Sequence, residues 1–150
     1  MNEISKVYDY VIELFQSNNL VHTISIVPTI EIDNNKENIY PLVNIDLTTS
    51  EVDDSIIVLD FEITILQQRN ISVIKTDSKL LSNTNFIDNM NETHSIAARF
   101  INVLAEHDND FNIDINSISK LKPLKFWGRN SLDGFQFTIS LSIPNSGKSC

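Results

Sequence analysis

The sequence has 150 residues, of which 41% are hydrophobic and 21% are charged, with eleven basic residues against twenty acidic ones. This length is typical of one domain with one core, and the composition excludes an intrinsically disordered chain. The formal net charge of −9 repels phosphate groups and argues against a nucleic-acid-binding protein. A local basic stretch more often decorates the solvent face of a strand or loop than a nucleic-acid site; it comprises Lys120, Lys122, Lys125 and Arg129.

The cysteine content and the N-terminal residues bear on the compartment. Cys150, the last residue, is the single cysteine, so an intrachain disulfide is impossible and a reducing compartment is expected. The start, Met-Asn-Glu-Ile-Ser-Lys, lacks the positive charge and apolar run of a signal peptide, and no stretch has the length needed to span a bilayer. We therefore expect a protein of the cytosol, or of an assembly made there, without membrane contact.

The first half of the chain predicts one helix and three strands. Apolar residues recur every three or four positions over residues 4–15, which indicates an amphipathic helix. Alternation from Val21 to Pro28 predicts a first strand, and a polar loop over residues 31–38 follows it. Residues 39–47 and 55–66 alternate between apolar and polar side chains, which predicts two long strands that each have one polar face.

A turn at Asp53-Asp54 joins those two strands. The stretch 67–89 is mostly polar, and a connection of this length is usually functional or mobile. Periodicity then predicts a second helix over residues 91–107.

Two or three strands close the chain. Phe111, Ile113 and Ile115 alternate briefly, and strands over residues 124–127 and 135–143 are joined by a turn at Asp133-Gly134. The expected fold is α+β: a mainly antiparallel sheet of four to six strands with two helices packed on one face, in the order α-β-β-β-α-β-β. Residues 1–150 form a single domain that ends in a flexible tail at 144–150.

No residue pattern indicates an enzyme or a cofactor. His94 and His107 lie thirteen residues apart in the second helix, and His22 sits among isoleucines, so no shared coordination is predicted. Asp108-Asn109-Asp110 lacks the glycine and the glutamate that complete a calcium loop. The Gly-Lys-Ser of the tail lacks the first glycine of a phosphate-binding loop. We predict no catalytic, cofactor-binding or metal-binding residue.

The order of elements and three local phrases resemble the small neck proteins of tailed bacteriophages. These are the tail-completion and tail-terminator-like subunits, particularly those of crAss-like and other Bacteroidota-infecting phages. The phrases are Tyr-Pro-Leu-Val-Asn-Ile at residues 40–45, Phe-Glu-Ile-Thr-Ile at 61–65 and Gly-Phe-Gln-Phe at 134–137. The resemblance covers residues 4–143. It departs after the third strand, where relatives often carry an acidic residue and this chain has Gln67-Gln68-Arg69.

The resemblance implies a structural virion protein assembled in the cytoplasm of a bacterial host. Its partners would be copies of itself in a ring, the portal or adaptor, and the tail proteins, and DNA would pass through the ring without specific binding. Two alternatives remain open. One is a small intracellular, non-enzymatic binding or regulatory domain that uses an open sheet face, and the other is an enzyme built from scattered residues.

The long polar segments 31–38 and 67–89 are the expected assembly surfaces, because such loops bury too little apolar area to offset their own ordering entropy. Apolar side chains within or beside them would serve as anchors amid polar contacts. The predicted interface residues are Glu31, Asp33, Lys36, Ile71, Val73, Ile74, Leu80, Leu81, Phe86, Trp127 and Arg129.

Overall fold

A computed structural model of the chain describes residues 3–34, 39–70, 85–106, 112–128 and 131–145. These residues form two α-helices, a 3-10 helix and one mixed, mostly antiparallel sheet of six strands. The predicted α+β class and the predicted order of elements are therefore confirmed. The elements are α1 (Glu3–Gln16), β1 (Thr23–Ser25), η1 (Thr29–Asn34), β2 (Leu42–Val52), β3 (Ile56–Gln68), α2 (Phe86–Glu106), β4 (Asp114–Ile118), β5 (Lys122–Trp127) and β6 (Leu132–Pro144).

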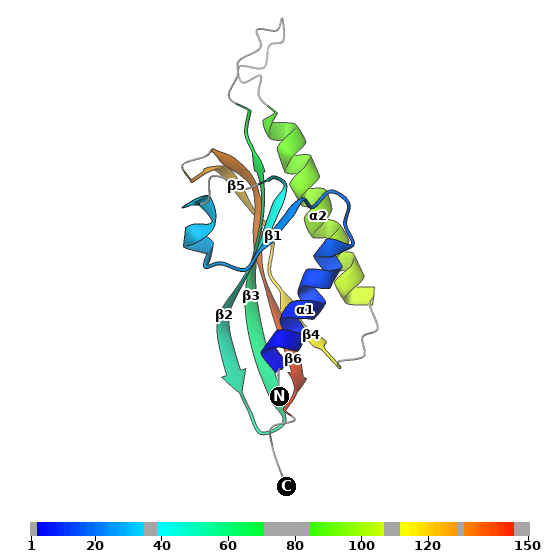
Figure 1. Ribbon diagram of the computed structural model, residues 1–150. Coiled ribbons are helices and arrows are strands. Elements are labelled where there is room, and N and C mark those ends of the chain that lie inside the picture. Colours follow the sequence, from blue (N-terminus) through cyan, green and yellow to red (C-terminus); the bar gives the residue numbers. More distant parts are fainter. Residues whose placement is uncertain (1–2, 35–38, 71–84, 107–111, 129–130, 146–150) are drawn as a thin grey trace, which may run out of the picture.

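The sheet has the strand order β1-β2-β3-β6-β4, and β5 also pairs with β6. The pair β1–β2 is parallel and every other pair is antiparallel. The two long central strands, β3 and β6, pair along their whole lengths, from Ile56 opposite Pro144 to Gln68 opposite Leu132. Figure 1 shows both α-helices on one side of the sheet and η1 on the other.

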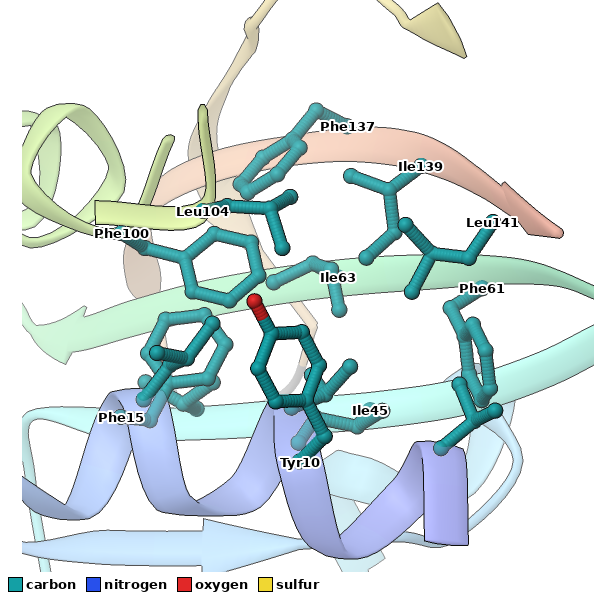
Figure 2. Close-up of a cluster of buried hydrophobic side chains, with 14 of the residues drawn as sticks. Tyr10, Phe15, Ile45, Phe61, Ile63, Phe100, Leu104, Phe137, Ile139 and Leu141 are labelled. Carbon is teal, nitrogen blue, oxygen red and sulfur yellow. The ribbon is translucent and has the colours of Figure 1, made fainter. Parts of the chain in front are cut away.

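The main core lies between the sheet and the two helices. Strand alternation points Phe61, Ile63 and their neighbours toward the helices, where the 3–4 periodicity of α1 and α2 presents matching apolar stripes (Figure 2). Phe15 of α1 stacks on Phe100 of α2 with ring centroids 4.1 Å apart. Both helices thus pack on one face of the sheet, as predicted, and Val11, Phe15, Phe100 and Leu104 are among the helix residues that contact it.

A second, smaller cluster covers one end of the opposite face, and it corrects the predicted loop over residues 31–38. The first part of that segment belongs to η1, because the side chain of Ile32 is buried against Leu42, Leu66 and other apolar residues of the sheet. Burial of this one isoleucine ties the segment to the domain. Residues 35–38 lie outside the described residues.

Several predicted boundaries shift. The first strand is shorter than predicted, since β1 has three residues, and β2 runs on to Val52. Helix α2 starts at Phe86, five residues before the predicted position 91. The added first turn buries the polar side chain of Asn89 instead of an apolar one, so hydrophobic periodicity missed it.

The turn predicted at Asp133-Gly134 is wrong. Both residues lie inside β6, and the turn falls just before it, where Gly128 and Ser131 have left-handed backbones with φ of 73° and 53°. Gly134 meets a different need, because a Cβ there would lie 1.7 Å from the carbonyl oxygen of Ile65 on β3. The glycine permits a close approach of two strands rather than a reversal of the chain.

The end of β6 is tied to the β2–β3 hairpin. Pro144 still belongs to β6, and the Asn145 amide N–H donates to the Ser55 carbonyl at 3.0 Å while its side-chain amide donates to the Asp53 carbonyl at 2.7 Å. Residues 146–150 of the predicted tail lie outside the described residues. At the same end of the sheet, Ile113 is buried in the core just before β4, while Phe111 lies outside the described residues.

Candidate interaction surface

Four of the predicted interface residues lie in the described ranges, and they belong to three different elements of the fold. Glu31 is exposed on η1, Phe86 begins α2 on the helix side of the sheet, and Trp127 packs half-buried against the smaller apolar cluster. Asp33 belongs to η1 by its backbone. The remaining predicted residues lie outside the described residues: Lys36, Ile71, Val73, Ile74, Leu80, Leu81 and Arg129.

A buried ion pair stands where β3 ends. The Arg69 guanidinium donates to the Asp133 carboxylate through Nε at 2.9 Å and through Nη2 at 2.7 Å. The Asp133 side chain is completely buried and that of Arg69 is 9% exposed. The Arg69 guanidinium carbon also lies 4.6 Å from the centre of the Phe86 ring, which is within cation–π range. Phe86 is therefore held by a charged group of the domain itself.

The sequence analysis did not predict this ion pair, although Arg69 is an unexpected residue at its position. Arg69 stands where the resemblance led us to expect an acidic residue, and Asp133 was read as part of a turn. The two residues are 64 positions apart, so no local pattern connects them.

Three asparagines hold the two ends of the segment 71–84 together. The Asn70 N–H donates to Asn85 Oδ1 at 2.6 Å. The buried Asn89 side chain donates to the Gln68 carbonyl at 3.0 Å and lies 3.4 Å from Asp133 Oδ2. The last described residue before the segment and the first after it are thus fixed at one end of the domain, beside an open hollow lined by residues 67–70.

The sheet face opposite the helices is polar beyond the η1 cluster. Cross-strand pairing arranges its side chains in rows that run over β2, β3 and β6. The rows are Asn44–Thr64–Gln136, Asp46–Glu62–Thr138 and Thr49–Asp60–Ser140. We call these nine residues the polar face. The alternation of strands β2 and β3 predicted a polar face of this kind.

Hydrogen bonds fix the carboxylates of the polar face. The Thr29 hydroxyl of η1 donates to Glu62 Oε1 at 2.6 Å, and the Thr29 N–H donates to Asp46 Oδ2 at 3.2 Å. Gln136 Nε2 donates to the same Glu62 oxygen at 3.3 Å. The freedom of these side chains is therefore restricted by the fold itself.

Asn44 anchors the chain that leads from β1 to η1. Its Oδ1 accepts from the Ser25 hydroxyl at 2.7 Å and from the Val27 N–H at 3.1 Å, and its Nδ2 donates to the Val27 carbonyl at 2.9 Å. This buried side chain replaces strand pairing where β1 ends, so the short β1 and η1 are held in place without a longer ladder.

Asp60 is the carboxylate whose ionisation the fold shifts. The hydroxyl of Ser140 and that of Thr49, which donates to Asp60 Oδ2 at 2.7 Å, hold the pKa of Asp60 below its usual value of 3.8, against the opposing effect of burial. Asp46, Asp60 and Glu62 thus give the polar face a concentration of negative charge, while Lys122 stands on β5 opposite Gln136 at its edge.

The described histidines stand apart from one another. His22 is exposed before β1, and His94 is exposed on α2 with its ring edge against Phe135, 5.2 Å between centroids. His107 lies outside the described residues. In the ranges that the structure describes, no three His, Cys, Asp or Glu residues come together in a way that could hold a metal ion.

Comparisons with known proteins identify no family for this chain. A scan against protein-family models found no match, and a search of curated proteins found none either. No helix within the described ranges is long and apolar enough to cross a membrane.

Proposed function

We propose that the chain is a structural virion protein, a subunit of a ring of identical copies in the neck of a tailed bacteriophage. The ring would link the portal or its adaptor to the tail. The observation that carries this proposal is the polar face, where three half-buried carboxylates lie on a sheet whose other face is packed on two helices.

The charge of that face suits a passage for DNA. Asp46, Asp60 and Glu62 project from neighbouring rows of one surface, and the whole chain has a net charge of −9. Negative charge repels the phosphate backbone, so DNA next to such a wall slides without sticking. Specific DNA binding is neither required nor favoured by this surface.

The two faces of the sheet differ in a way that supports the proposed role in the neck. The helix-covered face supplies the main hydrophobic core, so contacts with partners would involve the half-buried part of the polar face. Copies of the chain, the portal or adaptor, and the tail proteins are the proposed partners. The resemblance of the element order to phage neck proteins points the same way, and no cofactor is needed.

The place of the chain in a particle tests this proposal directly. We expect an antibody against the chain to label the head-to-tail junction in particles of the virus that encodes it. A chain found only in the soluble fraction of cells, in complex with a peptide or small molecule, would instead support a binding or regulatory domain.

A charge-reversal experiment tests the role of the polar face. The double variant Asp46→Lys/Glu62→Lys should hinder DNA passage, seen as a loss of infectivity in particles that still assemble. The matched control Asp9→Lys/Glu13→Lys makes the same change of net charge on the exposed side of α1 and should leave infectivity unchanged. Equal loss in both variants would show that net charge, and not this face, is responsible.

A further inference from the structure

At one end of the domain, both edge strands of the sheet lack a further paired strand among the described residues. Strand β1 pairs with β2 only at residues 42–44, and the Leu47 N–H is taken by the Tyr8 hydroxyl at 3.2 Å. In the part of the chain that the structure describes, no strand pairs with the outer edge of β2 over residues 48–52, or with the outer edge of β4. The side chains of residues 48–52 and 114–117 are all exposed.

The two open edges lie at the same level of the sheet. Following the register across the strands, Ser50 shares a row with Leu59, Leu141 and Ile115. The next row runs from Glu51 through Val58 and Ser142 to Asp114. Each edge also carries a register shift beside the row of Asp60 and Ser140.

The two edges also run in opposite directions. Strands β2, β3, β6 and β4 are antiparallel at each step, so β4 runs opposite to β2. Figure 1 shows the two strands on opposite sides of the central pair. A β4 edge from a second copy would therefore meet β2 in the antiparallel sense and continue the alternation of the sheet.

We propose that the β2 edge of one copy pairs head to tail with the β4 edge of the next copy, level with it, so that Ser50 faces Ile115 and Glu51 faces Asp114 across the joint. This inference rests on the proposed function, because it names the contact that builds the ring. A head-to-tail contact forms a ring when its rotation closes and an open filament when it does not. Joining edges at the same level leaves no displacement along the strands, which favours closure.

The same joint orders the faces of the ring. Because the sheet continues without turning over, all helix-covered faces lie on one side of the combined sheet and all polar faces on the other. Asp46, Asp60 and Glu62 of every copy then line a common surface.

The proposed joint brings together acidic residues of the two edges. Glu51 and Asp114 would face each other, and like charges directly opposite across strands are destabilising. Charged residues on edge strands protect free subunits from indiscriminate pairing. Association of the free chain should therefore be weak at low ionic strength and should strengthen as salt screens the pair.

Disulfide cross-linking tests the contact. In a Cys150→Ser background, the double variant Ser50→Cys/Ile115→Cys should give a ladder of covalent oligomers under mild oxidation. Within one molecule the two positions are three strand spacings apart, roughly 14 Å, which is too far for a disulfide. Each single variant alone should stay monomeric, while a mixture of the two should give dimers. A disulfide dimer from Ser50→Cys alone would instead show β2 pairing with itself, and would overturn the inference.

Charge exchange gives a second test with a matched control. Glu51→Lys should tighten association at each joint roughly 2- to 30-fold in sedimentation analysis, because a repelling pair becomes an attracting one. Adding Asp114→Lys should reverse the gain. Glu13→Lys, with the same change of net charge away from the edges, should have no such effect. Rings that form without cross-links and without this charge dependence would overturn the β2–β4 joint and leave the proposed function standing. Absence of rings, cross-links and charge dependence together would overturn both.

Discussion

Removal of one partner of the Arg69–Asp133 pair should destabilise the fold strongly. Asp133 is fully buried and Arg69 is 9% exposed, so Arg69→Met leaves a carboxylate in the interior without its guanidinium. Breaking a buried pair in this way costs about 3–5 kcal/mol. A domain of this kind has about 5–15 kcal/mol of stability in total, so the variant should lose a large part of it. The loss of the Phe86 contact adds to the effect.

Urea unfolding followed by circular dichroism provides the measurement. With a slope of about 1–3 kcal/mol per molar urea, a loss of about 3 kcal/mol lowers the midpoint by roughly 1–3 M. The double variant Arg69→Met/Asp133→Leu removes both charges and should recover much of that loss, because a buried pair can be replaced by apolar residues at little cost. A loss below about 1 kcal/mol in Arg69→Met, the size typical of exposed pairs, would refute this reasoning. A double variant no more stable than Arg69→Met would refute it as well.

Other substitutions test the remaining parts of the structure. Phe61→Ala should cost about 3–5 kcal/mol in urea unfolding, since the ring is fully buried between sheet and helices; a loss below about 1 kcal/mol would contradict its place in the core. Gly134→Ala should cost at least about 1–3 kcal/mol, because the new methyl meets the Ile65 carbonyl, and an unchanged midpoint would exclude that close approach. Burial, and to a lesser extent the charge of Asp46, raise the pKa of Tyr8 above 10.0 although its bond to the Leu47 N–H lowers it. Because the pKa of Tyr8 is higher in the folded than in the unfolded chain, the contribution of its neutral hydroxyl to stability is complete below pH 10.0 and is lost as pH rises through the raised pKa. Tyr8→Phe should lack that alkaline loss of stability. An identical dependence of stability on pH for both proteins would contradict the raised pKa. His22→Ala and His94→Ala should leave assembly and infectivity unchanged, and loss of either with normal unfolding behaviour would favour an enzyme.

The parts of the fold that could be predicted are those whose pattern is local. Helix α1 and strand β3 were found because one apolar stripe repeats at the helical period and one alternates at the strand period. The order of elements and the position of both helices on one face followed from such patterns. The polar face was predicted too, since each strand carries its polar residues on one side.

The parts that were missed depend on contacts between distant residues. The burial of Ile32, which makes η1 part of the domain, requires Leu42 and Leu66 to be in place. The start of α2 carries buried polar side chains that satisfy groups on β3 and β6, as Asn89 does for the Gln68 carbonyl. Asp133-Gly134 is a dipeptide typical of turns, but both residues lie within β6. Asp133 forms the ion pair with Arg69, and Gly134 lies close to the Ile65 carbonyl of β3. Among predicted interface residues, Phe86 proved to lie against Arg69, a contact that no spacing indicates.

The hydrogen bonds of Asn70, Asn85 and Asn89 make the stability of the domain largely independent of the number of residues between positions 70 and 85. Closing a loop costs only about 0.6 kcal/mol more for each doubling of its length, and here the two ends are bonded to each other and to the Gln68 carbonyl. Insertions and deletions between residues 70 and 85 therefore change the folding free energy little. Under the proposed function, the length of this segment could therefore differ between related proteins while the core, the ion pair and both sheet edges stay the same.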